Sequence, residues 1–310
     1  MKRKWIEQDM PDLTGKVIVV TGANSGLGFE SSKALAKKGA TVVMTARNME
    51  KGETARSDIL KEVPDASLDL MKLDVGDLSS VREFADSFKA KYDRLDILLN
   101  NAGLMAIPRK ETADGFEMQL GVNHLGHFAL TGLLLDVITK TPNARIHNVT
   151  STANFFGDIN FDDLMGKKNY SRWTAYSQSK LANVFFTFEL NRRLKAAGVD
   201  TIANVSHPGL VIGNLQSNSM EQSSTGGSEG IVYRIMQPLL AHDISMGILP
   251  MLYGMTAEDA KGGVMYEPRW FHHRGYPVEG KPNKKAYDAE ALKRFWEISE
   301  ELTGVKYSFS

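Results

Sequence analysis

The stretch KVIVVTGANSGLG, residues 16–28, decides the fold of this chain. Residues 16–21 form a short apolar run rich in β-branched side chains, which is typical of a strand buried on both faces. A glycine-rich turn follows, and residues 29–38 then show a helical pattern that ends at Gly39, as helices commonly do. Residues 41–45 predict the next strand. We therefore expect a strand–turn–helix–strand unit at the start of the fold.

The glycines of this turn carry a functional signal. Glycines allow a tight turn and let the backbone approach a pyrophosphate at the N-terminus of a helix. The spacing here is G-x-x-x-G-x-G and not G-x-G-x-x-G, so a glycine-rich turn without a ligand stays open as an alternative. If the turn binds a dinucleotide cofactor, the expected contacts are Gly22, Asn24, Ser25, Gly26, Leu27 and Gly28.

The end of the second strand indicates which dinucleotide would bind. An acidic residue at this position bonds the ribose 2′-hydroxyl of NAD(H), whereas a basic residue suits the 2′-phosphate of NADP(H). Here Ala46 is followed by Arg47. This favours NADP(H) over NAD(H), and the alternative is an exposed arginine at a strand end.

Strands and helices continue to alternate along the chain. A weakly alternating strand is predicted at 68–73, a buried strand at 95–99, further strands at 145–150 and 201–206, and a long helical stretch at 115–135. This alternation predicts an α/β fold, a doubly wound, Rossmann-type parallel sheet with helices on both faces. Ligands in such sheets bind at the carboxyl ends of the strands. The residues predicted at those ends are Asp74, Val75, Asn100, Asn101, Ala102, Gly103, Ser151, His207, Pro208 and Gly209.

Tyr176 and Lys180 lie four residues apart in a stretch that continues as a buried helix. Residues i and i+4 are neighbours on one face of a helix. A free tyrosine has a pKa of about 10, and a nearby cation lowers that pKa because it favours the phenolate. The pair is therefore a candidate acid/base device for the oxygen of an alcohol or a carbonyl. By itself, the same spacing is also common on ordinary helix surfaces.

Composition limits the class of protein. Lys and Arg total 37, as do Asp and Glu, so the formal net charge is zero, which argues against charge-driven binding of nucleic acid. The absence of cysteine excludes disulfides, thiolate catalysis and cysteine-based zinc sites. The basic start lacks an apolar segment, and no window approaches roughly 18 consecutive apolar residues. We expect a cytoplasmic protein without a secretory signal or membrane anchor.

One domain is expected over residues 1–310, with a core at about 14–210 and a variable region at about 211–310. The variable region is predicted to hold a Ser- and Gly-rich loop at 217–228, a helical segment at 230–253, a strand at 262–266, a loop at 270–283 and an amphipathic helix at 288–303 that ends at Gly304.

These motifs together resemble the short-chain dehydrogenase/reductase family. The matching positions are T-G-x-x-x-G-x-G at 21–28, Asp74, N-N-A-G at 100–103, Asn123, Ser151, Y-x-x-x-K at 176–180 and Pro208-Gly209. Finer features are similar to the retinol-dehydrogenase-like and WW-domain-oxidoreductase-like branch. These features are the long interval from Ser151 to Tyr176, the run YSQSKLAN at 176–183 and the tail EELTGVKY at 300–307.

The resemblance implies roles for individual residues. Tyr176 is implied as the general acid/base, and Lys180 as the cation that lowers its pKa and holds the nicotinamide ribose. Ser151 is implied to hydrogen-bond the substrate oxygen, and Asn123 to take part in a proton relay. Asp74 would contact the adenine edge. The remaining implied cofactor contacts are Val75, Asn101, Ala102, Gly103, Pro208 and Gly209.

The chain also departs from the family. A threonine often follows Pro-Gly by a few residues, and Gly213 and Asn214 occupy that region here. Membrane-bound retinol dehydrogenases carry an N-terminal anchor, which we do not expect in this chain. Because family members are commonly dimers or tetramers, a homodimer is a further expectation.

Four histidines invite alternative interpretations. His124 and His127, close to Asn123, could line the pocket, but we predict packed or solvent-facing helix residues. The pair at 272–273 could suggest a metal, but it has no carboxylate or cysteine partner at a suitable spacing. We therefore predict a loop there, and no metal site.

The predicted function is hydride transfer between NADP(H) and a small-molecule carbonyl or alcohol, that is, a carbonyl reductase or alcohol dehydrogenase. Apolar residues of the variable segments predict a pocket for a bulky apolar substrate, lined by Phe155, Trp173 and Leu210. Further candidates are Met105, Phe156, Met165, Ile212 and Met220, and the alternative for each is a place in the core. The alternative is a non-catalytic NADP(H)-binding regulator or redox sensor. Such proteins have often lost the tyrosine or the lysine, whereas this chain has both Tyr176 and Lys180.

Overall fold

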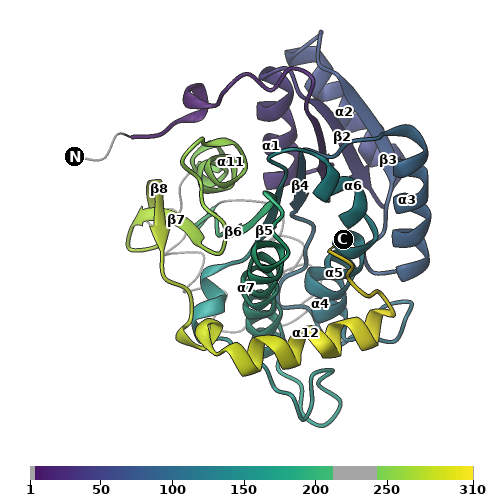
Figure 1. Cartoon of the computed structure of the whole chain (residues 1–310), viewed down its shortest axis with the longest axis vertical. Helices are drawn as coiled ribbons and strands as arrows, with labels where there is room; N and C mark the ends of the chain where they lie inside the picture. The colour runs from purple at the N-terminus through teal and green to yellow at the C-terminus, as the bar shows by residue number, and fades with distance from the viewer. Residues whose placement is uncertain (1–3, 212–242, 310) are drawn as a thin grey trace.

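The computed structural model describes residues 4–211 and 243–309. The strands of this part of the chain join one sheet in the order β3-β2-β1-β4-β5-β6-β7-β8 (Figure 1). Neighbouring strands are parallel except at the edge, where β8 runs antiparallel to β7. The strands are β1 (Val17–Val20), β2 (Thr41–Ala46), β3 (Leu68–Lys72), β4 (Ile97–Asn100), β5 (Arg145–Val149), β6 (Ile202–Ser206), β7 (Met265–Trp270) and β8 (Arg274–Gly280).

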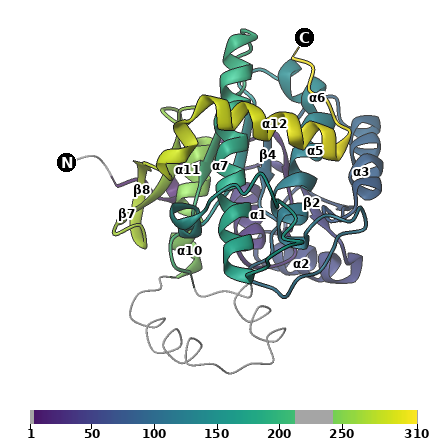
Figure 2. The same ribbon diagram turned by 90° about the horizontal axis from the view of Figure 1, so that it is seen from below.

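Helices cover both faces of the sheet, as Figures 1 and 2 show. The first face carries α1 (Gly26–Lys37), α2 (Met49–Glu62), α10 (Ile244–Gly247) and α11 (Leu249–Thr256). The opposite face carries α3 (Leu78–Lys91), α5 (Gly126–Leu133), α7 (Arg172–Ala196) and α12 (Ala289–Thr303). Shorter elements are η1 (Glu7–Asp9), α4 (Met118–Leu120), η2 (Gly121–Leu125), α6 (Leu135–Lys140), η3 (Thr152–Phe156) and η4 (Lys284–Tyr287).

Strand β1 shows why the apolar run at 16–21 folds this way. Val17 and Val19 pack in a core cluster with residues of α3, α5 and α7. Ile18 and Val20 belong to the cluster under α1, α2 and α11. Successive side chains of a strand point to opposite faces, so a central strand between two helical layers must be apolar throughout. The doubly wound fold predicted from this pattern is confirmed.

The helical stretch predicted at 115–135 is interrupted. It begins as α4, passes through the π-helical turn η2, and continues as α5. A Cβ on Gly126 would lie 2.0 Å from the carbonyl oxygen of Val75, so the helix and the end of the β3 loop touch directly through the backbone. Single π turns inside helices are frequent at functional sites. Asn123 lies in this turn.

The variable region is only partly as predicted. Helix α12 is confirmed, with Asp288 capping its first turn and Gly304 ending it at φ +64°. The loop predicted at 270–283 is wrong over half of its length, because β8 occupies Arg274–Gly280. Its Gly and Pro residues suggested a loop, but β8 lies at the sheet edge, where a proline such as Pro277 is tolerated. The loop predicted at 217–228, Gly213, Asn214 and most of the segment at 230–253 lie outside the described residues.

Candidate active site

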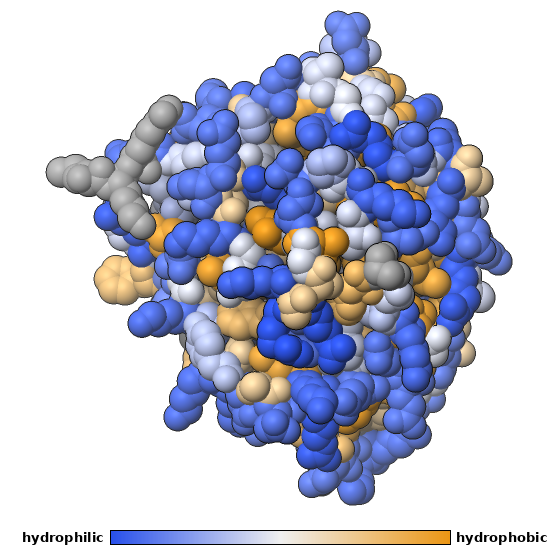
Figure 3. Space-filling view, in the orientation of Figure 1, coloured by the Kyte–Doolittle hydropathy of each residue, from blue (hydrophilic) through white to orange (hydrophobic). Residues whose placement is uncertain are grey.

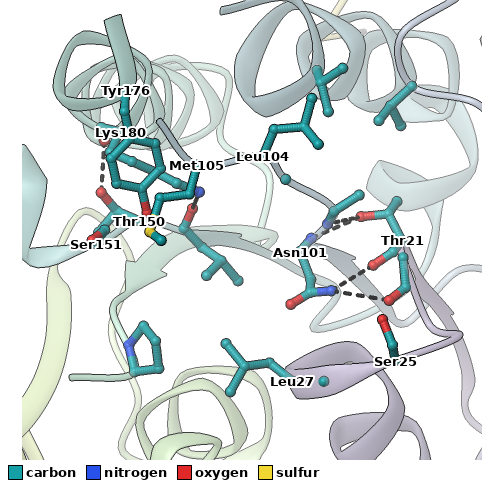
Figure 4. Close-up of a pocket in the computed structure, with 18 of the residues that line it drawn as sticks. Thr21, Ser25, Leu27, Asn101, Leu104, Met105, Thr150, Ser151, Tyr176 and Lys180 are labelled. Carbon is teal, nitrogen blue, oxygen red and sulfur yellow. Dashed lines mark hydrogen bonds between the residues drawn. The ribbon is translucent and has the colours of Figure 1, made fainter. Parts of the chain in front are cut away.

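A cavity of about 760 Å³ runs along the carboxyl ends of the central strands, at the point between β1 and β4 where the strand order reverses. Figure 4 shows Tyr176, Lys180 and Ser151 together on one side of it, and Thr21 and Ser25 on the other. Most of the predicted site residues line this cavity: Gly22, Asn24, Ser25, Gly26, Leu27, Arg47, Asp74, Val75, Asn101, Ala102, Gly103, Ser151, Trp173, Tyr176, Lys180, Pro208, Gly209 and Leu210. Gly28, Asn100, Asn123, Phe155 and His207 are not among the lining residues.

At Gly22 and Gly28 the glycine-rich turn is packed so closely that a side chain has no room. A Cβ on Gly22, whose φ is +66°, would lie 3.0 Å from the Cα of Ala102. A Cβ on Gly28 would lie 2.3 Å from the carbonyl oxygen of Gly22 and 2.6 Å from Nδ2 of Asn101. Gly28 therefore supports the turn from behind, although we had placed it among the cofactor contacts.

Helix α1 begins at the floor of this turn and presents its N-terminus to the cavity. Its N-cap residue, Ser25, makes no side-chain capping hydrogen bond, and the first turn holds no acidic residue. The free N–H groups and the positive end of the helix dipole favour an anion at this point. Together with the backbone cradle of Gly22, this arrangement can hold the phosphates of a dinucleotide.

Thr21 was not predicted as a site residue, yet it joins the turn to the neighbouring strand. Its Oγ1 accepts hydrogen bonds from the backbone N–H groups of Asn101 and Ala102, at 2.8 and 2.9 Å. The Nδ2 of Asn101 donates to the carbonyl oxygen of Thr21 at 2.8 Å (Figure 4). The signals in the sequence were the position of Thr21 at the end of the first strand and its place as the first residue of the motif at 21–28.

Two cations lie at the β2 end of the cavity. The Arg47 side chain is 75% exposed, and its Nε lies 3.8 Å from Oδ2 of Asp74. Lys51, on the first turn of α2, also lines the cavity and was missed by the sequence reasoning. Asp74 accepts a hydrogen bond from the N–H of Gly76 at 2.9 Å, which fixes its carboxylate at the end of β3.

Tyr176 and Lys180 face the cavity from the first part of α7. Lys180 is 5% exposed, and its Nζ lies 5.9 Å from the centre of the Tyr176 ring. Its ammonium group donates to the carbonyl oxygen of Val149 at 3.2 Å. Burial lowers the pKa of Lys180 to about 8, because desolvation disfavours the charged form. The helix thus places a buried amine beside a phenol at the wall of the cavity.

Ser151 follows β5 and starts the η3 turn. Its Oγ accepts from the N–H of Ala153 at 3.3 Å. The next residue back, Thr150, donates through Oγ1 to the carbonyl oxygen of Lys180 at 2.7 Å. This hydrogen bond ties the end of β5 to α7, so Ser151 and Lys180 are held on the same side of the cavity.

Asn123 lies behind the cavity wall and not in it. Its Oδ1 accepts from the N–H of Leu104 at 2.7 Å, and its Nδ2 donates to the Leu104 carbonyl oxygen and to Oγ of Ser179. These bonds hold the Gly103–Leu104 wall against α7. The relay role implied for Asn123 stays a prediction.

His127 connects Asn123 to the glycine-rich turn. Both His124 and His127 are buried, as the packing interpretation predicted. Burial lowers the pKa of His127 to about 4, so its ring is neutral at pH 7. Nδ1 lies 3.2 Å from the Asn123 carbonyl oxygen, which can only accept, so Nδ1 carries the proton. Nε2 then accepts from Oγ1 of Thr21 at 2.9 Å.

The lining near Tyr176 is apolar. Trp173 and Leu210 belong to it, as predicted. Phe155 does not, because the η3 turn directs its ring onto the His272 and His207 rings, with centroids 4.9 and 6.0 Å away. Phe156 lines the cavity in its place. Met105, another pocket candidate from the sequence, also lines the cavity, whereas Leu104, Val211 and Ile244 are apolar lining residues that the sequence did not suggest. The candidates Ile212 and Met220 lie outside the described residues.

His272 has a carboxylate partner, and the statement that it has none is wrong. Ligand-type atoms of His207, Glu267 and His272 all lie within 4.8 Å of one another. Glu267 precedes His272 by five residues, but the hairpin between β7 and β8 folds the two side chains together. The spacing of the residues in the chain could not reveal this contact.

The sequence profile of the short chain dehydrogenase family matches residues 16–224. This chain belongs to the short-chain dehydrogenase family. It is an oxidoreductase of the retinol-dehydrogenase-like branch of that family. Retinol dehydrogenase 12 from Homo sapiens is 39% identical over 304 residues, covering 95% of this chain and 88% of the relative. Retinol dehydrogenase 11 from Homo sapiens is 48% identical over 207 residues, covering 67% and 64%.

Solved structures place this short-chain dehydrogenase in the same fold. An uncharacterized protein from Mycobacterium paratuberculosis is 38% identical with a TM-score of 0.81, covering 99% of this chain and 100% of that one. A short chain dehydrogenase from Shigella flexneri, complexed with NADP, is 23% identical with a TM-score of 0.63, covering 83% and 98%. The second likeness concerns the fold alone.

The molecular surface gives a further finding on this short-chain dehydrogenase. The face in Figure 3 is mostly hydrophilic, and its hydrophobic residues form scattered areas among hydrophilic ones. Within residues 4–211 and 243–309, no helix is both long and apolar enough to cross a membrane.

Proposed function

We propose that this chain is an NADP(H)-dependent oxidoreductase that interconverts a bulky apolar alcohol and its carbonyl compound, with Tyr176 as the general acid/base. One observation carries the proposal. A single cavity joins an anion-binding helix N-terminus at one end to Tyr176 and the buried Lys180 at the other. The bound nicotinamide would supply or accept the hydride.

The chain's own residues would handle the proton. In reduction, the Tyr176 hydroxyl would donate its proton to the substrate oxygen, and in oxidation the phenolate would take it back. Lys180, while charged, favours the phenolate because the two groups share a buried environment. The Ser151 hydroxyl lies at the same wall and would hydrogen-bond the substrate oxygen as charge develops on it.

The preference for NADP(H) is supported by the charges at the β2 end. Arg47 and Lys51 both line this end of the cavity, next to the ribose position expected from the fold. A guanidinium group pairs well with a phosphate. The lone carboxylate at this end, Asp74, follows β3; its Oδ1 accepts from a backbone N–H, and its Oδ2 lies 3.8 Å from Nε of Arg47. Because the Arg47 side chain is 75% exposed and this ion pair is long, both cations would be able to turn to a 2′-phosphate.

The class of substrate is supported by the lining beyond Tyr176. Met105, Phe156, Trp173, Leu210 and Ile244 offer apolar surface and no charge. The relatives described above are named retinol dehydrogenases, which supports a bulky apolar primary alcohol or its aldehyde as substrate. The cytoplasmic location and the homodimer stay predictions.

The test is turnover of reduced cofactor in a panel of apolar aldehydes, ketones and quinones. We expect NADPH to be oxidised faster than NADH with at least one apolar aldehyde or ketone. Tyr176→Phe should lower kcat about a thousandfold while Tm and the NADPH dissociation constant stay unchanged. A folded Tyr176→Phe protein with the wild-type rate would contradict the mechanism. Tight NADPH binding by wild type without turnover of any compound would favour the sensor.

A further inference from the structure

Glu267 accepts hydrogen bonds from two histidines beside the cavity. Its Oε2 lies 3.1 Å from Nε2 of His207 and 2.6 Å from Nδ1 of His272. His207 and Glu267 are buried, and His272 is half exposed. The three side chains come from the end of β6, from β7 and from the turn between β7 and β8.

The hydrogen bond of Gly209 decides which atoms carry the protons. The N–H of Gly209 donates to Nδ1 of His207 at 3.2 Å, so Nδ1 has no proton and Nε2 must carry it. Nε2 therefore donates to Glu267, and a metal ion could not bind there without reversing the ring's tautomer against the Gly209 N–H. Burial raises the pKa of Glu267, but the hydrogen bonds from His207 and His272 outweigh it and hold the pKa below its ordinary value.

The hairpin that carries Glu267 also holds the wall of the cavity. The carbonyl oxygen of His273 accepts from the N–H of Leu210 at 3.3 Å. A Cβ on Gly209, whose φ is +77°, would lie only 2.3 Å from the same carbonyl oxygen. Pro208, Gly209 and Leu210 line the cavity directly. The Pro208–Leu210 wall therefore contacts the β7–β8 hairpin in two ways. The first is the backbone contact with the His273 carbonyl, and the second is the chain of hydrogen bonds His207–Glu267–His272.

The residues packed around Glu267 and its two histidines leave space for the three side chains. A Cβ on Gly280 of β8 would lie 2.3 Å from Cδ of Glu267, so the carboxylate occupies the space that a side chain would take. On the cavity side, the Phe155 ring packs against His272, with the centroids 4.9 Å apart. Phe155 belongs to the η3 turn that starts at Ser151. The same cluster thus contacts the cofactor wall and the turn that carries Ser151.

We propose that Glu267 is a positioning residue for cofactor binding, which holds His207 and His272 so that the Pro208–Leu210 wall keeps the shape that the nicotinamide end requires. The proposal rests on the dinucleotide site described under Proposed function. It adds a residue that lies outside the cavity and acts through the two histidines.

Substitutions at His272 give a matched test, because its φ is +60°. Asparagine and glycine both tolerate this left-handed backbone. His272→Asn keeps a side-chain N–H near the position of Nδ1, whereas His272→Gly removes the donor without adding backbone strain. We expect His272→Gly and Glu267→Gln to weaken NADPH binding about tenfold, the scale of a lost hydrogen bond to a charged group. His272→Asn should stay within about twofold of wild type for the same reason.

The measurements are NADPH and NADH dissociation constants, Tm, and KM for cofactor and carbonyl substrate. A positioning role predicts a raised cofactor KM with the carbonyl KM unchanged, and rescue by His272→Asn. Gly280→Ala should resemble Glu267→Gln, because it displaces the carboxylate. Lys261→Gln is the control, because it breaks only the exposed ion pair of Lys261 with Glu279 on the same hairpin, 3.0 Å apart.

Three results would overturn the inference. The first is wild-type cofactor affinity in both His272→Gly and Glu267→Gln. The second is equal loss in His272→Asn and His272→Gly, which would indicate a packing role for the ring. The third is a rise in Tm with stoichiometric Zn²⁺ that Glu267→Gln abolishes, which would make the cluster a metal site. If wild type bound neither NADPH nor NADH, the proposed function itself would fail, and that result is distinguishable from these three.

Discussion

At the glycine-rich end of the cavity the backbone itself forms the binding surface, whereas at the Tyr176 end the wall is made of buried side chains. The first end works because Gly22 and Gly28 carry no Cβ, and its chemistry comes from N–H groups and a helix dipole. The second end works because Lys180 holds an amine in a place where water does not solvate it. The glycine-rich end is therefore limited by the space around its backbone, and the Tyr176 end by the free energy of burying a charge. Substitutions at each end should distinguish these two effects.

Lys180→Met should give the largest effect on kcat. It should also show that the buried charge of Lys180 lowers the free energy of unfolding. We expect kcat to fall about a thousandfold, because the cation beside Tyr176 is lost. The pKa of Lys180 is lowered from 10.5 to about 8, so below pH 8 the folded chain holds a charge that burial disfavours. The variant without cofactor should therefore be more stable at pH 7, by about 1–2 kcal/mol after the lost hydrogen bond to Val149 is counted.

The pH dependence provides the check on that interpretation. The free-energy cost of burying the Lys180 charge is fully present below pH 8. It disappears as the pH rises to 10.5, the ordinary pKa of a lysine. Denaturant unfolding between pH 7 and 10.5 should therefore show the gain of Lys180→Met shrinking toward zero. If Lys180→Met were less stable than wild type at pH 7, the ammonium group of Lys180 would have to be well solvated or paired. Burying a charge would then not limit the Tyr176 end.

Gly28→Ala should break the other end through space alone. The added Cβ meets the Gly22 carbonyl oxygen at 2.3 Å, so the turn must move, at a cost of about 1–3 kcal/mol in unfolding free energy. We expect cofactor affinity to fall by about a hundredfold because the phosphate cradle is displaced. For the unfolding free energy without cofactor, Gly26→Ala is the matched control, because its Cβ would meet no protein atom within 4 Å and it adds only the strain of φ +58°. Equal losses in the two variants would show that strain, not space, limits this end.

Arg47→Ala should give the smallest effect and test the cofactor preference. Its side chain is 75% exposed, so we expect NADPH affinity to fall about tenfold and NADH affinity by less than about twofold. Lys51→Ala offers a comparison from the next helix, with a smaller expected loss for NADPH. Titration of each cofactor by fluorescence would measure all four values. An equal loss for NADPH and NADH would remove the assignment of a 2′-phosphate site at Arg47.

The elements with strong periodicity were predictable from the sequence. Strand β1, Val17–Val20, is apolar at every position because both of its faces are buried, and α12 shows one apolar face because only one side packs. Strand β8 was missed because Gly and Pro also occur at a sheet edge. The site residues at the strand ends could be predicted from the sequence. Which of Phe155 and Phe156 lines the cavity could not, because it depends on the direction of a single 3₁₀ turn.

By itself, the sequence determined the alternation of strands and helices over the core, the glycine-rich turn and the Tyr176–Lys180 pair, because these depend on local spacing and on which residues must be buried. Only the tertiary structure decided that Lys180 is desolvated, that His127 joins Thr21 to Asn123, and that Glu267 meets two histidines. These contacts depend on strand register, on the π turn at Asn123 and on the β7–β8 hairpin. The spacing of residues along the chain does not predict these contacts, because the packing of the elements sets the distances between the side chains.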